Sequence, residues 1–321
     1  MGKNDIKRQT IFETFSNNLK LVRRIDGVGE KTEEIKGDYI CPICSEGFND
    51  KDLNQNTTNP LTLEDVPPKS LGGKQIALTC EKCNNGLGEK IDWHLAERLK
   101  ELEFKDKKPF SQLTGKFTID KMDLTVNGKI VYNEKGETQN HYSKKNNNPK
   151  TLDIFLSNTK RGTKIHFDPK PSRVDPKKIQ IGLLKNAYLL MFEKFGYSFI
   201  LNAQFDRIRE QLRNPTQDIY PLNCWFQGPF PKEHLGVSFI TEKGLESIFV
   251  LFELKTKKTN RIFAVILPLI DNDIEHIINE LSNRFEKENS LTVKMAKYHD
   301  DYLKDEDSIK LLVNWMRGIK H

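Results

Sequence analysis

Four of the five cysteines form two Cys-x-x-Cys pairs, Cys41 with Cys44 and Cys80 with Cys83, and 35 residues separate the pairs. This spacing is typical of a tetrahedral four-cysteine zinc site, in which each thiolate lies about 2.3 Å from the ion. The alternative, two thioredoxin-like redox motifs, requires a βαβ setting that the neighbouring sequence does not predict. We therefore predict structural zinc. Four thiolates complete its coordination, so catalysis would lie elsewhere. The fifth cysteine, Cys224, is predicted to be a buried thiol.

Oxygen ligands for a second cation lie between the cysteine pairs and directly after them. Glu64 and Asp65 are adjacent acids before a Pro-Pro sequence, and Asn84 follows the last cysteine of the second pair. Carboxylate and amide oxygens are ligands that Mg²⁺ accepts. Because both pairs would be fixed to one zinc ion, we expect Glu64 and Asn84 to lie close enough to share a cation.

The stretch from about residue 38 to residue 100 resembles the HNH, or His-Me finger, endonucleases. The resemblance is to their zinc-bearing treble-clef branch, which includes the endonuclease VII type of resolvase, and it is limited to this motif region. It implies a ββα finger in which Glu64 and Asn84 hold a catalytic Mg²⁺ or Mn²⁺ and Asp65 stands at the general-base position. Further matches to the motif are Pro68, Ser70, Gly72 and Gly73, and Gln75 stands where the family has an Asn that holds the loop.

The family has a histidine where this chain has Asp65, and no histidine occurs between Cys41 and Cys83. A carboxylate with a pKa near 3.9 is a weaker base than an imidazole near 6.5. Two roles for Asp65 therefore remain open. It could deprotonate the attacking water, or it could be a second carboxylate ligand, with the metal activating water by coordination.

The resemblance implies metal-dependent hydrolysis of phosphodiester bonds in DNA, with RNA as the alternative substrate. It also implies a bacterial antiphage or mobile-element role. Lys69, Ser70 and Lys74 are the expected phosphate contacts of the finger. The alternatives are a zinc module that binds nucleic acid without cutting it, and a subunit that recruits a protein partner or a second copy of the chain.

Positive charge is concentrated in one part of the chain. Between Lys105 and Lys178 there are 17 Lys and Arg against 8 Asp and Glu, whereas the whole chain has a net charge of +6. A basic stretch suits a polyanion such as nucleic acid, although a solvated lysine-rich face is the alternative. The expected contacts are Lys144, Lys145, Lys160 and Arg161.

Hydrophobic patterning predicts an α+β protein, in which the zinc-bound ββα finger precedes a larger α+β domain with antiparallel strands. We expect an N-terminal helical or extended segment (1–37), the finger (38–104) and a C-terminal domain for substrate binding, sensing or partner recruitment (105–321). A helix after Cys83 is expected to leave His94 as a surface or interdomain histidine, and the same expectation holds for Asp92.

In the C-terminal domain, patterning predicts a hairpin with its turn at Asn127-Gly128 and a strand near residues 153–156. It also predicts a central apolar helix over 176–195 and a helix over 203–213. Strands are predicted at 236–240, 247–252 and 261–267, and helices at 273–288 and 306–319.

Composition excludes several classes of protein. Only 36% of residues are hydrophobic, and no apolar run approaches the roughly 18 residues typical of a membrane span. The first residues lack the apolar region of a secretory signal. We therefore expect a cytoplasmic protein without a membrane partner.

Overall fold

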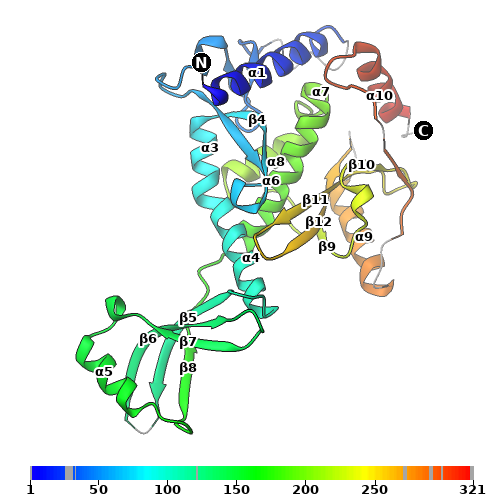
Figure 1. Cartoon of the computed structure of the whole chain (residues 1–321). Helices are drawn as coiled ribbons and strands as arrows, with labels where there is room; N and C mark the ends of the chain where they lie inside the picture. Colours follow the sequence, from blue (N-terminus) through cyan, green and yellow to red (C-terminus); the bar gives the residue numbers. More distant parts are fainter. Residues whose placement is uncertain are drawn as a thin grey trace. The chain divides into compact units, whose positions relative to one another are not determined.

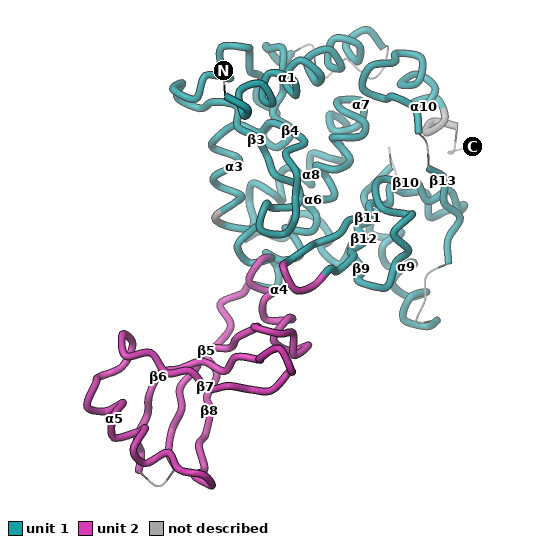
Figure 2. The backbone as a smooth tube through the Cα atoms, in the orientation of Figure 1, with its two compact units in different colours: residues 1–95, 175–256, 260–321 teal, residues 96–174, 257–259 magenta. Residues whose placement is uncertain are grey.

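The computed structural model describes residues 2–25, 32, 34–120, 122–269, 273–288, 292–297 and 299–318. It is an α+β structure with two compact units (Figures 1 and 2). Unit 1 comprises residues 1–95, 175–256 and 260–321, and unit 2 comprises residues 96–174 and 257–259. Among the described helices, none combines the length and apolar composition that a membrane crossing requires.

Unit 1 begins with helix α1 (Lys3–Val22), followed by two short hairpins that carry the cysteine pairs. Strands β1 (Tyr39–Ile40) and β2 (Gly47–Phe48) flank the first pair. Strands β3 (Leu61–Val66) and β4 (Lys74–Cys80) form the second hairpin, and α3 (Glu81–Leu87) begins where β4 ends. A π-helical segment (Gly88–Asp92) and α4 (Trp93–Lys105) continue this helix, and the boundary between the units falls within α4.

The turn of the second hairpin depends on its two glycines. Gly72 has a φ of +84°, in the left-handed region that favours glycine. A Cβ on Gly73 would lie 1.4 Å from the carbonyl oxygen of Pro67. The Gly-Gly sequence therefore allows β3 to return as β4 over a close backbone contact.

Helix α6 (Pro176–Phe195) is the central element of unit 1, as its apolar sequence predicts. The Asp175 side chain caps its first turn by accepting a hydrogen bond from the Lys177 amide at 2.9 Å. The helix ends at Gly196, whose φ is +56°. It packs against β3 and β4 of the cysteine-bearing region and also against the large sheet of unit 1.

That sheet has the strand order β13-β10-β11-β12-β9 and is antiparallel throughout. The three predicted strands are confirmed as β10, β11 and β12, and the predicted helices as α8, α9 and α10. The predicted end of the last helix, residue 319, lies outside the described residues. The bounds are β9 (Trp225–Gln227), β10 (Gly236–Ile240), β11 (Ser247–Lys255), β12 (Asn260–Pro268), β13 (Met295–Ala296), α7 (Tyr197–Ile200), α8 (Ala203–Arg213), α9 (Ile274–Glu288) and α10 (Glu306–Gly318).

Unit 2 contains most of α4 and a four-stranded antiparallel sheet of order β7-β6-β5-β8, and helix α5 packs on one face of this sheet. Two local predictions are wrong here. Strand β6 continues through the Asn-Gly sequence, because Asn127 and Gly128 both pair with β5. Residues 153–156 are helical, since Asn148 caps a helix that starts at a proline. The bounds are β5 (Gln112–Ile119), β6 (Leu124–Tyr132), β7 (Thr138–Tyr142), α5 (Pro149–Asn158) and β8 (Ile165–Pro169).

The compact units differ from the predicted domains 1–37, 38–104 and 105–321. Residues from 175 onward, apart from 257–259, belong with residues 1–95 rather than with the basic segment. The physical reason is that α6 and α7 supply buried side chains that complete the interior of the cysteine-bearing region, as described next.

Candidate metal centre

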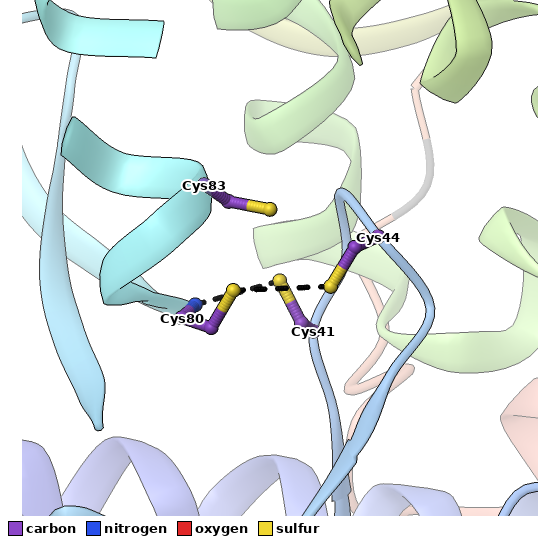
Figure 3. Close-up of side chains that lie close together, drawn as sticks. All are labelled: Cys41, Cys44, Cys80 and Cys83. Carbon is purple, nitrogen blue, oxygen red and sulfur yellow. Dashed lines mark hydrogen bonds between the residues drawn. The ribbon is translucent and has the colours of Figure 1, made fainter. Parts of the chain in front are cut away.

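The four paired cysteines form one cluster. Their sulfur atoms all lie within 4.8 Å of one another, and Cys44 and Cys80 Sγ are 3.8 Å apart. Tetrahedral coordination with bonds of about 2.3 Å places neighbouring sulfurs roughly 3.8 Å apart. Figure 3 shows the sulfurs of Cys41 and Cys44 from the β1–β2 loop pointing towards those of Cys80, at the end of β4, and Cys83, in the first turn of α3. The cluster could hold a metal ion, consistent with structural zinc.

The thiols of the cluster influence one another strongly. Burial raises the pKa of the Cys41 thiol well above its ordinary value. Hydrogen bonds from the neighbouring thiols, that of Cys41 first, lower the pKa of Cys80. A zinc ion held by the four cysteines would remove this competition for protons, because all four sulfurs would then bind as thiolates.

Three buried tyrosines hold the two hairpins around the cluster. The Tyr188 hydroxyl of α6 donates to the Pro42 carbonyl at 2.6 Å, inside the first Cys-x-x-Cys pair. The Tyr197 hydroxyl of α7 donates to the Ile40 carbonyl at 2.8 Å. The Tyr39 hydroxyl donates to the carbonyl of Leu78 on β4 at 2.7 Å. The cysteine-bearing region is therefore built into unit 1.

Glu64 lies on β3 with its side chain buried against α6. One carboxylate oxygen, Oε1, is 2.8 Å from the Lys185 ammonium. The other, Oε2, accepts a hydrogen bond from the Thr79 hydroxyl at 2.9 Å. Both oxygens of the predicted metal ligand therefore have partners within the protein.

Asp92 completes a buried ion triad. Its Oδ2 lies 2.8 Å from Lys185 Nζ, so one ammonium bridges the carboxylates of Asp92 and Glu64. Burial acts to lower the pKa of Lys185, but the two carboxylates outweigh it and the pKa is raised. Burial raises the pKa of Asp92, whereas Lys185 opposes this shift. Asp92 Oδ1 is buried and has no hydrogen-bond partner among the described residues.

Asn84 is fixed to the strand that carries Glu64. Its side-chain nitrogen donates to the Thr62 hydroxyl at 2.9 Å and to the Leu63 carbonyl at 3.0 Å. Since the Leu63 carbonyl only accepts hydrogen bonds, the Asn84 atom that faces it is the amide nitrogen. Thr62 and Glu64 are two residues apart on β3 and share a face. The structure thus brings Asn84 to the Glu64 face of the strand.

Asp65 lies in a different environment from Glu64. Its side chain is partly exposed, and successive strand residues point to opposite faces. The register shifts at this step, because Glu64 pairs with Ala77 and Asp65 with Gln75. Burial raises the pKa of Asp65, while the charge of Lys69 opposes the shift.

The predicted phosphate contacts are all exposed. Lys69 and Ser70 lie in a short 3-10 turn between β3 and β4, and Lys74 begins β4. In unit 2, the turn after β7 carries Lys144 and Lys145, and the turn after α5 carries Lys160 and Arg161.

Sequence reasoning missed Lys185 and Thr79. It placed Asp92 on the surface, which is wrong, and it placed His94 either on the surface or between domains, of which the contact with Asp175 of the predicted C-terminal domain supports the second. The π-helical segment Gly88–Asp92 changes the rotation of the helix, so Asp92 turns inward to Lys185. His94 is 9% exposed, and its Nδ1 accepts a hydrogen bond from the Asp175 amide at 3.1 Å. One signal was present: a lysine within an apolar central helix requires a buried acidic partner.

Comparison with known protein families, curated proteins and solved structures gives no match to this chain.

Proposed function

We propose that the chain is a metal-dependent endonuclease whose catalytic region is a zinc-stabilised ββα finger of the treble-clef type. The order of elements supports this: a loop with one cysteine pair, the β3–β4 hairpin, and a helix whose first turn carries the second pair. The observation that carries the proposal is the attachment of Asn84 to β3, two residues before Glu64.

The proposed metal site consists of Glu64, Asn84 and Asp92. Carboxylate and amide oxygens suit Mg²⁺ or Mn²⁺, and the buried, unpartnered Oδ1 of Asp92 is an additional ligand atom. When bound, such an ion supplies charge neutralisation at the phosphate and at the leaving oxygen.

The neighbouring side chains have separate roles in the proposal. Asp65 orients the attacking water and accepts its proton, and its raised pKa makes it a better base than an ordinary carboxylate. Lys69, Ser70 and Lys74 bind neighbouring phosphates of the DNA or RNA. These contacts involve the backbone of the nucleic acid and predict little sequence preference.

Lys185 favours a second candidate function. Its ammonium already lies on both Glu64 and Asp92, where a cation would bind. In the endonuclease, the divalent ion binds beside the ammonium or displaces it. If the Lys185 ammonium stays bound to both carboxylates, no divalent ion can bind there. The cysteine-bearing region is then a zinc module that binds nucleic acid without cutting it.

Incubation of zinc-loaded protein with supercoiled plasmid and Mg²⁺ or Mn²⁺ tests the proposal. The wild type is expected to nick the plasmid, and Glu64→Gln and Asn84→Ala to lose activity by about 100-fold or more. Glu46→Gln and Asn85→Ala are matched controls, since both residues are exposed and neither side chain makes a hydrogen bond in the described structure. Nicking that survives both site substitutions contradicts the proposed site. Binding without nicking by the wild type supports the second candidate.

A further inference from the structure

The sheet of unit 2 has one covered face and one open face. On the covered face, Phe117 and Val126 pack against Leu152 and Phe155 of α5. Side chains alternate along each strand, so the residues between these positions point to the other face. Exposure follows this alternation along β5, where Gln112, Thr114 and Lys116 are exposed and Phe117 is buried. The view of unit 2 in Figure 1 shows α5 on only one side of the sheet.

Three lysines and a histidine gather on the open face. The strand register pairs Lys129 with both Thr114 and His141, and Lys116 with Asp168. Lys116 is therefore diagonal to Lys129 on the next strand. Lys170 follows β8 directly, and its amide donates to the Thr114 carbonyl. The face forms a hollow of about 880 Å³ lined by these residues.

Most of this charge has no counter-ion on the face. Within the described part of unit 2, neither Lys116 nor Lys170 forms an ion pair or a side-chain hydrogen bond, and Lys129 donates only to Gln112, at 2.8 Å. Asp168 is the one acid among the lining residues. Unit 2 as a whole contains 19 Lys and Arg against 10 Asp and Glu, so its net charge is +9 while that of the chain is +6.

We propose that the open face of the unit 2 sheet, centred on Lys116, Lys129 and Lys170, binds the phosphate backbone of double-stranded nucleic acid. The proposal rests on the proposed function only for the choice of nucleic acid as the polyanion. The proposed contacts lie on a face of the sheet. They differ from the contacts predicted from sequence, which lie in the turns that carry Lys144 and Lys160.

A duplex fits this face better than a single strand. Proteins that bind single strands stack bases on exposed aromatic rings. The lining residues include no Phe or Trp. The ring of Tyr142, the one phenol among them, packs against Phe117 and Phe155 of the covered face. Contact is therefore with phosphates and is independent of base sequence.

Fluorescence anisotropy of the full chain with a labelled 20-bp DNA duplex, at several salt concentrations, tests the proposal. The variant Lys116→Gln/Lys129→Gln/Lys170→Gln removes three charges from the face. Lys135→Gln/Lys150→Gln/Lys164→Gln removes three charges from exposed positions outside the lining residues and is the matched control. A single-stranded oligonucleotide and an RNA duplex of the same sequence identify the form of nucleic acid that binds.

Each lost phosphate contact reduces the slope of log K against log salt by about 0.9 for a duplex. The face variant is expected to lose about 2 to 3 units of slope and at least tenfold in affinity near 0.1 M salt, and the control less than one unit. The single variant Lys116→Gln, whose native side chain forms no hydrogen bond or ion pair among the described residues, is expected to lose about 0.9 units of slope. Equal losses in the face variant and the control overturn the proposal, as does tighter binding of the single strand. Because this readout is binding, it is independent of whether Glu64→Gln abolishes cleavage.

Discussion

Glu64 and Lys185 form a buried ion pair that contributes to stability, and Glu64 is also a proposed metal ligand. Two carboxylates and one ammonium give the buried triad a net charge of −1 when all three groups are ionised. Removing the ammonium leaves two buried carboxylates unpaired, whereas neutralising Glu64 leaves a balanced pair of Lys185 and Asp92. The two substitutions therefore have unequal effects on folding.

We predict that Lys185→Met lowers the free energy of unfolding by about 3 to 5 kcal/mol, because it leaves buried charge uncompensated. Glu64→Gln is predicted to cost less than about 2 kcal/mol, since the amide oxygen still accepts from Lys185. Urea unfolding of the two zinc-loaded variants measures the difference. Equal losses of unfolding free energy, or a larger loss for Glu64→Gln, would show that Lys185 does not compensate the two carboxylates in the folded protein.

Asp65→His is predicted to retain or increase nicking, because it introduces the histidine that HNH endonucleases have at this position. Burial raises the pKa of Asp65, so the wild-type rate should rise with pH through a value above the ordinary 3.8. The histidine variant should rise later, near pH 6.5. Rates measured from pH 4.5 to 8 separate the two profiles. Loss of cutting with zinc retained would identify Asp65 as a metal ligand instead of a base.

The cysteines are predicted to differ in their reaction with iodoacetamide. Burial raises the pKa of the Cys224 thiol to about 12, so at pH 8 it has almost no reactive thiolate. In native, zinc-loaded protein all five cysteines should resist alkylation. With a chelator, peptides containing Cys41, Cys44, Cys80 and Cys83 should be labelled before the Cys224 peptide. Mass spectrometry of the peptides measures the order of labelling. Labelling of Cys224 before the four paired cysteines would contradict its burial in the core.

At the scale of elements, the four-cysteine cluster and α6 contact the same two hairpins. Strands β1 and β2 have two residues each, too few to be stable alone. They are held by the cysteine cluster on one side and by Tyr188 and Tyr197 on the other. Loss of metal should therefore disturb unit 1 beyond the finger itself.

We predict that chelation of zinc lowers the melting temperature of the chain and exposes the core around Tyr188, because α6 packs against β3 and β4. Differential scanning calorimetry and tyrosine fluorescence with and without a chelator measure this. Restoration by added zinc, and not by Mg²⁺, is the control. An unchanged melting temperature would mean that the tyrosine contacts suffice without the metal.

Sequence patterns predicted the elements with strong hydrophobic periodicity and missed those decided by tertiary contacts. Helix α6 and strands β10, β11 and β12 follow from long apolar runs. The Asn-Gly sequence in β6 favours a turn, but pairing with β5 on both sides of it keeps the strand extended. Nothing local in Gly88–Asp92 indicates a π-helical segment, so the inward turn of Asp92 could not be foreseen.

In the candidate site too, the sequence predicted local features and missed those that depend on tertiary contacts. The spacing of the cysteines was enough to predict their cluster, because two residues between thiols suit a single ion. The partner of Glu64 could not be predicted, since Lys185 is 121 residues away in sequence and only packing brings the two together. Residues 175–256 likewise join residues 1–95 in one compact unit through packing that no local pattern indicates.

At the scale of the whole molecule, the two compact units have net charges of opposite sign. Unit 2 has a net charge of +9, so unit 1 has −3. We therefore propose that unit 2 binds the duplex and that the cysteine-bearing region of unit 1 carries the proposed cleavage site. Salt should weaken the binding of nucleic acid strongly, because that binding depends on phosphate contacts.

We propose that Glu64 and Asn84 share a second cation beside the cysteine cluster. Titration of zinc-loaded protein with Mn²⁺, followed by electron paramagnetic resonance of the free ion, measures this directly. We predict one Mn²⁺ bound per chain in the wild type and in the Asn85→Ala control, and none in Glu64→Gln or Asn84→Ala at the same concentrations. Absence of Mn²⁺ binding in the wild type, or equal binding in all four proteins, would contradict the claim.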